Sequence, residues 1–395
     1  MMIKRLGEIA SFQRGLTYSK GDEAPLSSKC VLRSNNIDLE SSSLDLTEIK
    51  YLRDDFIIPK DRKLKANSIF ICMSNGSKQH VGKVAFIDKD MDYAFGGFMG
   101  LIVPSSEVSA KYVFYACQSS AYRSFLSQVG NGIGITNLRF SDLEKFEIPV
   151  PSLSEQQRIV DELDLLSGII EKKNAQLRTL DELASTIFYE MFGDLITNER
   201  GWNTVALKDV CGINPSKKEV SARLSEQANV SFLPMEDLPI HAGYISVKQI
   251  RTLKEVAGSY TYFADNDVLL AKVTPCFENG KVGIAHNMDN GVGFGSSEFF
   301  VFRPSEKVSK ETLYFLVQTN TFISEASKQL TGTSGLRRVP RMFLENLQIG
   351  LPPIAEQLSF SNKFKHIFDE RAKIASSISS SEELLSSRLD KYFNT

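Results

Sequence analysis

Residues 155–192 read EQQRIVDELDLLSGIIEKKNAQLRTLDELASTIFYEMF, with apolar side chains recurring in alternating steps of four and three. This spacing places them on one stripe of an α-helix, along which a second helix can pack as a coiled coil. The pattern returns 201 residues later, so two long helices are predicted at equivalent places. The seam positions are Ile159, Leu163, Leu166, Ile170, Lys173, Leu177, Leu180, Ala184, Ile187 and Met191, matched by Phe360, Phe364, Ile367, Arg371, Ile374, Ile378, Ser381, Leu385, Arg388 and Tyr392.

Polar residues interrupt the predicted seam at Lys173, Arg371, Ser381 and Arg388. A polar seam residue can fix the register of paired helices. It can also contact a partner subunit, or lie in solvent at the edge of the helix. The sequence leaves these readings open.

The repeat extends upstream of both helices, because residues 150–156 match residues 351–357 at the same offset. Each match contains the pattern Pro-x-x-x-Glu-Gln. Proline ends the preceding strand and leaves the next residues free to begin a helix, for which Ser154 is the predicted N-cap of a helix over 155–192. Since shorter matches recur further upstream, the chain reads as a tandem duplication.

We predict an α+β fold with two similar globular domains of mixed α/β structure and two long helices, in tandem repeat. Short apolar runs predict strands at 68–72, 81–87, 100–103, 268–271, 282–285 and 299–302. Helix-like order predicts helices within 109–128 and 309–329. The predicted segments are a first globular domain at 1–150, a central helix at 151–193, a second globular domain at 194–350 and a C-terminal helix at 351–395.

Composition narrows the class of protein. With 395 residues, 42% hydrophobic and 24% charged, the chain has the composition of a soluble protein of two or three domains. Five scattered cysteines predict reduced thiols and a cytoplasmic location, and no apolar run reaches the ~18 residues of a membrane span. The net charge of −2 argues against a basic surface over the whole molecule, so any nucleic-acid surface must be local.

The motifs expected of an enzyme are missing from the sequence. Gly76 to Lys83 resembles a phosphate-binding loop, but five residues separate its glycines where four are needed, and Val84 replaces the required Ser or Thr. The glycine-rich run 130–134 lacks the βαβ context of a dinucleotide site. We therefore predict no catalysis, cofactor or metal. An enzyme with an unrecognised site would depend on the isolated His80 and Cys276, for which structural roles are the better interpretation.

The loops of both copies carry side chains that can form hydrogen bonds with base edges. Equivalent loops hold different side chains, which favours two readers of different sequences on one scaffold. For any single residue, an ordinary solvated turn is the alternative. Arg337, Arg338 and Arg341 give the densest local positive charge, suited to phosphates or guanine edges. The predicted DNA-binding residues are Gln13, Arg14, Arg33, Asn35, Asn36, Asn75, Ser77, Lys78, Gln79, His80, Asn137, Arg139, Lys217, Lys218, Lys272, Thr274, Asn279, Lys281, Thr333, Ser334, Arg337, Arg338 and Arg341.

Two variable globular segments, each closed by Pro-x-x-x-Glu-Gln and followed by a long helix, resemble the specificity subunit of type I restriction-modification systems. Residues 267–281, DVLLAKVTPCFENGK, are also similar to a stretch common in the target-recognition domains of that family. The first copy departs from this stretch, with Asn67-Ser68 where the second has Asn266-Asp267, and it lacks the Thr-Pro-Cys run.

The resemblance implies that each globular domain reads one half of a split double-stranded DNA target. It implies two antiparallel helices acting as a spacer, and a chain that recruits methyltransferase subunits, expected to be two, and restriction subunits while catalysing nothing itself. A helix of 38 residues would be about 57 Å long, enough to hold two domains about a DNA turn apart. The alternative is a non-catalytic coiled-coil adaptor whose globular parts bind protein or carbohydrate, which the near-neutral charge favours.

Overall fold

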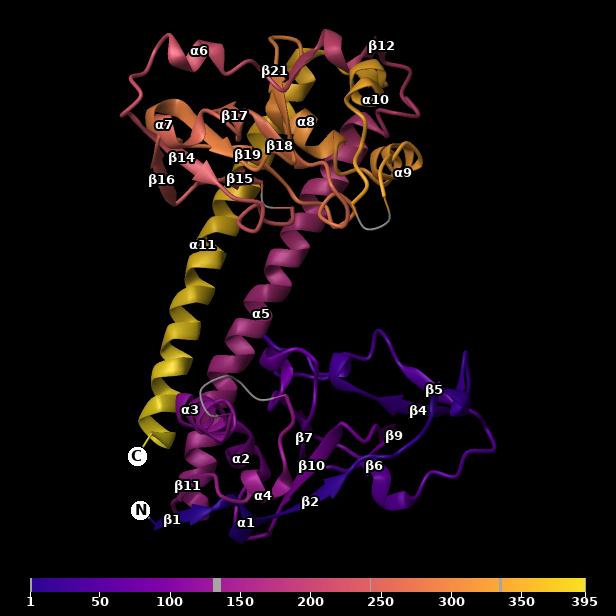
Figure 1. Cartoon of the computed structure of the whole chain (residues 1–395), viewed down its shortest axis with the longest axis vertical. Coiled ribbons are helices and arrows are strands. Elements are labelled where there is room, and N and C mark those ends of the chain that lie inside the picture. The colour runs from indigo at the N-terminus through magenta and orange to yellow at the C-terminus, as the bar shows by residue number, and fades with distance from the viewer. Residues whose placement is uncertain (1, 131–135, 242, 334–335, 395) are drawn as a thin grey trace. The chain divides into compact units, whose positions relative to one another are not determined.

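The computed structural model describes residues 2–130, 136–241, 243–333 and 336–394. Contacts divide the chain into two compact units, residues 1–175 with 376–395, and residues 176–375. Helix α5 (Leu153–Phe192) contributes its first part to the first unit and its last part to the second, and α11 (Ile354–Phe393) does the reverse (Figure 1). Because this division cuts both long helices, the four predicted segment boundaries stay predictions.

Three β-sheets form within the described part of the first unit. One is a four-stranded antiparallel sheet in the order β2-β10-β7-β8, and another has the order β3-β5-β4-β9-β6, in which β4 and β9 run parallel. The third pairs β1 with β11. The strands are β1 (Met2–Arg5), β2 (Ala10–Arg14), β3 (Glu23–Ala24), β4 (Lys29–Leu32), β5 (Lys50–Leu52), β6 (Lys63–Leu64), β7 (Ser68–Cys72), β8 (Val84–Ile87), β9 (Met91–Phe95), β10 (Met99–Pro104) and β11 (Glu147–Val150).

The second unit repeats the core of this topology, with β15 added at one edge and, among its described residues, no counterpart of β3. Its sheets have the orders β13-β21-β18-β19-β15 and β16-β14-β20-β17, with β14 and β20 parallel, and β12 pairs with β22. The predicted α+β tandem repeat is therefore confirmed. The strands are β12 (Asn203–Ala206), β13 (Cys211–Ile213), β14 (Asn229–Leu233), β15 (Tyr244–Ile245), β16 (Gln249–Thr252), β17 (Thr261–Ala264), β18 (Val268–Ala271), β19 (Val282–Ala285), β20 (Val292–Gly295), β21 (Phe299–Pro304) and β22 (Gln348–Leu351).

Helices cover one face of the central sheet in each unit, α2 on β7, β8 and β10, and α8 on β18, β19 and β21 (Figure 1). Each predicted helical segment is in fact two helices, because Ser119 and Thr319 cap new helices by accepting the N–H of Tyr122 and Phe322. The shorter helices are α1 (Leu6–Ile9), α2 (Ala110–Ala116), α3 (Ser120–Val129), α4 (Phe140–Leu143), α6 (Lys218–Ser221), α7 (Leu253–Val256), α8 (Lys310–Leu316), α9 (Asn320–Lys328) and α10 (Arg341–Asn346).

The predicted core strands are present, with one correction. Strand β8 begins at Val84, so the prediction of a strand from residue 81 is wrong at its start. Gly82 adopts φ +85° there, and its N–H donates to the Cys72 carbonyl oxygen at 2.8 Å, so the chain turns before the strand begins. A left-handed φ of this kind favours glycine, which explains why the strand cannot start earlier.

The difference between Asn67-Ser68 and Asn266-Asp267 leaves the turn unchanged. Asn67 and Asn266 both have positive φ, 56° and 72°. The N–H of each donates at 2.8 Å to the carbonyl oxygen at the end of the second strand that follows, Ile87 of β8 and Ala285 of β19. What differs is the buried partner, because Asp267 accepts two hydrogen bonds from Arg303 at 2.7 and 2.8 Å. The first copy has no charge to neutralise here.

The long helices pair through the predicted seam, and every seam position is buried or half-buried. In the first unit, Ile159 and Leu163 share a core with Leu389 and Tyr392. In the second, Ala184 of α5 shares a core with Phe360 and Phe364 of α11, and Ile187 and Met191 pack against this core. The predicted helix pairing is therefore confirmed within each unit.

The polar seam residues contact the opposite helix rather than solvent alone. In the first unit, the Lys173 ammonium donates to the Ser377 and Ser381 hydroxyls at 2.6 and 3.0 Å, and Arg388 pairs with Glu162 at 3.0 Å. Residue numbers rise along α5 as they fall along α11, so the helices are antiparallel there. In the second unit, Arg371 pairs with Asp181 at 2.8 Å. These contacts tie specific positions together and so define the register.

Helix α5 begins two residues earlier than predicted, and its cap is different. The Ser152 hydroxyl accepts the Glu155 N–H at 3.4 Å, and the Ser152 carbonyl accepts the Gln156 N–H at 2.9 Å. The prediction of Ser154 as the N-cap is therefore wrong, because Ser154 already lies in the first helical turn.

The glutamine of each Pro-x-x-x-Glu-Gln motif is fully buried and fastens the long helix to the globular part. Gln156 accepts the Ser109 N–H at 2.8 Å and donates to the Pro151 carbonyl at 2.9 Å. Gln357 accepts the Ser309 N–H at 2.9 Å and donates to the Lys307 and Pro352 carbonyls at 3.1 and 2.8 Å. The motif is thus a structural joint, repeated in both units.

We expect Gln357→Leu to lower the free energy of unfolding by about 2–4 kcal/mol, because it leaves buried backbone groups without partners at roughly 1–3 kcal/mol each. The matched control is Glu356→Ala, since Glu356 is the exposed neighbour in the same helical turn. Denaturant unfolding measures both. Equal losses in the two variants would contradict the role of Gln357 as a joint.

Candidate nucleic-acid interface

Three strands of the first unit place polar loops at one edge of the four-stranded sheet. Because neighbouring strands are antiparallel, the end of β2, the start of β10 and the end of β7 lie together, with Arg14 opposite Gly100 and Cys72 opposite Met99. Two cavities of about 850 and 530 Å³ open there. Arg14 and Phe98 line both cavities. The predicted residues that line one or both are Arg14, Arg33, Asn35, Asn75, Asn137 and Arg139.

Three buried side-chain atoms in the described part of the chain lack a hydrogen-bond partner, and all belong to predicted DNA-binding residues. They are Gln13 Oε1, Arg33 Nε and His80 Nδ1. Buried polar atoms are normally satisfied, so each of these calls for a partner from outside the chain or for an explanation. Arg33 also lines the larger cavity, which makes its unused donor relevant to a ligand there.

The other predicted residues of the first unit divide by exposure. Ser77, Lys78 and Gln79 are exposed in the loop after Asn75. Asn36 is 1% exposed, and its side-chain amide donates to the Asp45 and Glu48 carbonyls while its oxygen accepts the Arg33 N–H. Asn36 therefore shapes the loop that presents Arg33, and its side chain does not reach the surface.

The second unit presents the equivalent edge with different side chains. Val273 and Arg338 form the same type of isolated antiparallel bridge as Ser74 and Asn137. Each arginine of the predicted cluster faces a carboxylate, Arg337 with Glu278 at 3.6 Å, Arg338 with Glu298 at 2.8 Å and Arg341 with Glu345 at 2.7 Å. The hydrogen bond from Arg338 lowers the pKa of Glu298, so this carboxylate is ionised at neutral pH. The local positive charge is therefore balanced in the free chain, by exposed pairs that contribute little to stability.

Three predicted lysines are held by backbone carbonyl groups. Lys217 donates to Ala257 and Gly258, Lys272 to Ser297, and Lys281 to Met235 and Glu236. Lys281 is the counterpart of Lys83, which donates to Ile37 at 2.6 Å, so this lysine stabilises the same loop in both copies. Thr274 is 7% exposed, whereas Lys218, Asn279 and Thr333 are exposed. Ser334, like residues 131–134 of the glycine-rich run, lies outside the described residues.

The family model described as the type I restriction modification DNA specificity domain matches residues 1–179 and again residues 199–376. The chain belongs to this family. Both matches include one globular part and more than half of the helix that follows it, in agreement with the repeated topology of the specificity domains.

Curated relatives are named as specificity subunits of type I restriction enzymes. The EcoAI specificity subunit of Escherichia coli is 37% identical over 158 residues, which cover 40% of this chain. The match spans only about a quarter of that subunit and of the EcoEI subunit, 26% and 28% of their lengths. The StySPI specificity subunit of Salmonella potsdam is 24% identical over 375 residues, covering 90% of this chain and 78% of that protein.

Solved structures share the fold. The S subunit of a type I restriction-modification system from M. genitalium has a TM-score of 0.52 at 14% identity, covering 100% of this chain and 96% of that chain. A chain from a structure of type I R-M complex assembly and conformational transition has a TM-score of 0.51 at 18% identity, covering 99% and 97%. At these identities the likeness concerns the fold alone.

Sequence reasoning missed two features of the specificity domains. It gave no role to Phe98, which lines both cavities of the first unit, nor to its counterpart Glu298, which binds Arg338. An apolar residue beside a predicted strand is expected to be buried, so Phe98 carried no signal. The neighbouring Gly96-Gly97 pair, which indicates a tight turn, was the only local hint.

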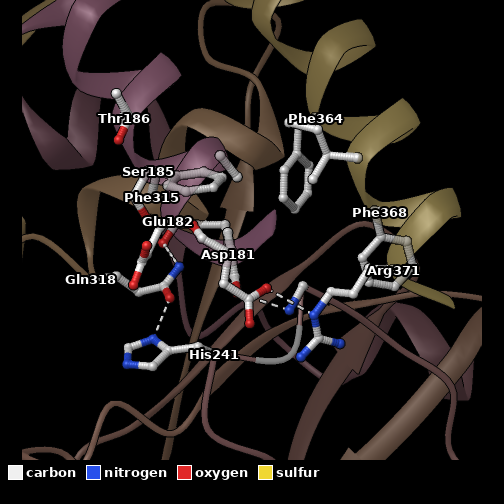
Figure 2. A pocket seen from close by; sticks show the side chains of 14 residues that line it. Asp181, Glu182, Ser185, Thr186, His241, Phe315, Gln318, Phe364, Phe368 and Arg371 are labelled. Atoms are coloured by element: carbon white, nitrogen blue, oxygen red, sulfur yellow. Dashed lines mark hydrogen bonds and ion pairs between the residues drawn. The ribbon is translucent and has the colours of Figure 1, made fainter. Parts of the chain in front are cut away.

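Another cavity, of about 470 Å³, lies in the second unit where α5 and α11 meet α8 (Figure 2). Figure 2 shows Asp181 of α5 beside Arg371 of α11, and His241 bonded to Gln318. The residues described as lining it include none of the predicted DNA-binding residues. It is a feature of the helix pair.

The described residues contain no group of three or more His, Cys, Asp or Glu side chains placed to hold a metal ion. None of the described helices is long and apolar enough to cross a bilayer. The five cysteines form no disulfide, as predicted. Burial raises the pKa of Cys72 to about 11 and that of Cys117 to about 12, which keeps both as neutral thiols. Cys276 packs against a core cluster, the position of a structural residue.

Proposed function

We propose that this chain is the DNA sequence-recognition subunit of a type I restriction-modification complex, with each globular domain reading one half of a bipartite double-stranded DNA target. One observation carries the proposal: the same sheet edge presents Phe98 and Asn137 in the first copy but Glu298 and Arg338 in the second. A shared scaffold that presents different polar and aromatic side chains suits two domains that recognise different DNA sequences. A duplicated enzyme would keep its reactive groups in both copies.

The proposed interface consists of exposed and half-buried side chains around these edges. Asn36 and Thr274 are left out because their side chains are buried, and Lys217, Lys272 and Lys281 because their ammonium groups bond to backbone carbonyls. In the first domain, predicted at 1–150, it comprises Gln13, Arg14, Arg33, Asn35, Asn75, Ser77, Lys78, Gln79, His80, Asn137 and Arg139. In the second, predicted at 194–350, it comprises Lys218, Asn279, Thr333, Arg337, Arg338 and Arg341.

The long helices set the separation of the half-sites and dock the catalytic partners, expected to be two methyltransferase subunits together with restriction subunits. The chain itself catalyses nothing and works in the cytoplasm. Support comes from relatives named as subunits of type I restriction enzymes and from polar contacts that fix the helix register. A protein- or carbohydrate-binding adaptor has no specific contact in its favour.

The decisive experiment is sequencing of methylated sites in cells that express this chain with methyltransferase partners. We expect one motif with two specified halves and an unspecified spacer, and loss of that motif when the chain is omitted. A motif without a split, or a motif that persists without this chain, would contradict the proposal.

Arg338 and Glu298 give a test with opposite signs. We expect Arg338→Ala to weaken binding of the target duplex roughly 5- to 150-fold, the loss typical of one base-reading arginine. We expect Glu298→Gln to strengthen binding at low salt, because the carboxylate no longer competes with DNA for the guanidinium group. Titration of the assembled complex at two salt concentrations measures both. Effects of the same sign would show that the pair serves only stability.

A further inference from the structure

Phe98 is an exposed aromatic side chain in a polar setting. It is 72% exposed, and it lines both cavities of the first unit together with Arg14. Asn75 lies on one side, in the larger cavity, and Asn137 and Arg139 lie on the other. Leaving a phenylalanine in water forgoes the gain of burying it, so its position calls for a partner.

The turn that carries Phe98 is fixed from several sides. Its carbonyl oxygen accepts the N–H groups of Met73 and Ser74 at 2.8 and 3.1 Å, and Met99 closes the turn by donating to Gly96 at 2.8 Å. Gly96 in turn donates to Leu32 at 2.9 Å. The backbone beneath the ring is therefore held by two sheets, so binding has to order only the side chain. A pre-ordered aromatic side chain makes an efficient contact.

The surroundings of Phe98 select the kind of partner. A docking site for protein would extend the apolar surface, but the two cavities that the ring lines contain three arginines and three asparagines against two carboxylates, Glu23 and Glu48. The buried Nε of Arg33, a residue of the larger cavity, has no partner. Positive charge and amides around a single ring suit a base and its phosphates. Apolar side chains inserted at base steps unstack them, and aromatic side chains stack on the exposed base.

The second copy lacks this feature. Glu298 occupies the equivalent turn position, because the N–H of Lys272 donates to its carbonyl just as that of Met73 donates to Phe98. A carboxylate cannot stack on a base in this way, and Glu298 is occupied with Arg338. A stacking contact from this turn is thus confined to one half of the target.

We propose that Phe98 stacks on a base of the half-site bound by the first domain and unstacks the adjacent base step. The inference rests on the proposed function. Sequence preference at this step then comes partly from the cost of unstacking, which is lowest at pyrimidine–purine steps, and not only from hydrogen bonds to base edges.

The test uses the complete complex with its methyltransferase subunits and a duplex carrying the target found by methylated-site sequencing. Fluorescence of 2-aminopurine at each adenine, and permanganate reactivity at each thymine, report unstacking across both half-sites and their flanks. Because methyltransferases extrude their target base, signals at the methylated positions are expected in every variant. We expect one additional signal, at a single step of one half-site away from those positions. Phe98→Ala should remove it and weaken binding roughly 5- to 150-fold, and Phe98→Trp should keep it.

The matched control is Ile57→Ala, because Ile57 is 84% exposed in the same unit but lines neither cavity. It should change neither signal nor affinity. Specific binding without the additional unstacked step, or an additional signal that survives Phe98→Ala, would overturn this inference and leave the proposed function standing. Absence of sequence-specific binding by the unmodified complex would overturn both.

Discussion

A chain lengthened by one heptad in each long helix is expected to direct methylation to a target whose half-sites are unchanged and whose spacer is about three base pairs longer. Seven residues add roughly 10.5 Å of helix at ~1.5 Å per residue, and base pairs stack at ~3.4 Å. Seven residues also preserve the phase of a seam that repeats every 3.5. Sequencing of methylated sites measures the spacer directly.

The structure indicates where the heptads belong. Insertion after Ala175 in α5 and before Ser376 in α11 follows the division between the two units. It leaves Lys173 with Ser377 in the first unit and Asp181 with Arg371 in the second. A heptad in α5 alone is the control, because it offsets the seam of one helix against the other and should abolish activity. An unaltered spacer with both heptads present would contradict the role of the helices as a spacer.

The sequence predicted the features that repeat at short intervals. The seam from Ile159 to Met191 and the strand at 268–271 were predicted correctly, because the spacing of apolar residues within one segment shows which side chains are buried. The polar seam residues were recognised as exceptions, but their role was left open. Only the position of Ser377 and Ser381 on the facing helix decides that Lys173 fixes the register.

The features that escaped prediction depend on contacts between distant segments. The Gln156 side chain accepts the Ser109 N–H, and Arg338 forms a salt bridge with Glu298. No local sequence pattern indicates these pairs. Asn36 resembled a base-reading side chain in sequence, yet the loop folds around its amide. The composition of the loops therefore pointed to one edge of the sheet, but it did not show which of their side chains are free to act.

Replacement of residues 1–150 by residues 202–351, the equivalent part of the second copy, is expected to give a target with two identical half-sites. They should lie in the inverted orientation that antiparallel helices imply. The second half-site should keep its sequence, because its reader is untouched. Methylated-site sequencing tests this, and a change in the second half-site would contradict independent reading by the two domains.

The stability of the chain with two copies of the second domain depends on how the incoming domain packs on helix α5. In both copies a serine N–H donates to the side-chain oxygen of a buried glutamine, so Gln156 can accept the N–H of the incoming Ser309. The apolar partners differ, because Phe315 packs on Phe360 and Phe364 in its own unit, with ring centroids 5.2 and 5.1 Å apart, whereas the graft meets Ile159 and Leu163. Adding Ile159→Phe and Leu163→Phe should therefore raise the free energy of unfolding by about 1–3 kcal/mol over the simple graft, as expected for restored packing. The same two substitutions in the parent chain are the control and should destabilise it by overpacking, and thermal unfolding of all four chains measures the difference. If the substitutions destabilise the graft as much as the parent, the aromatic contacts do not match each domain to its helix.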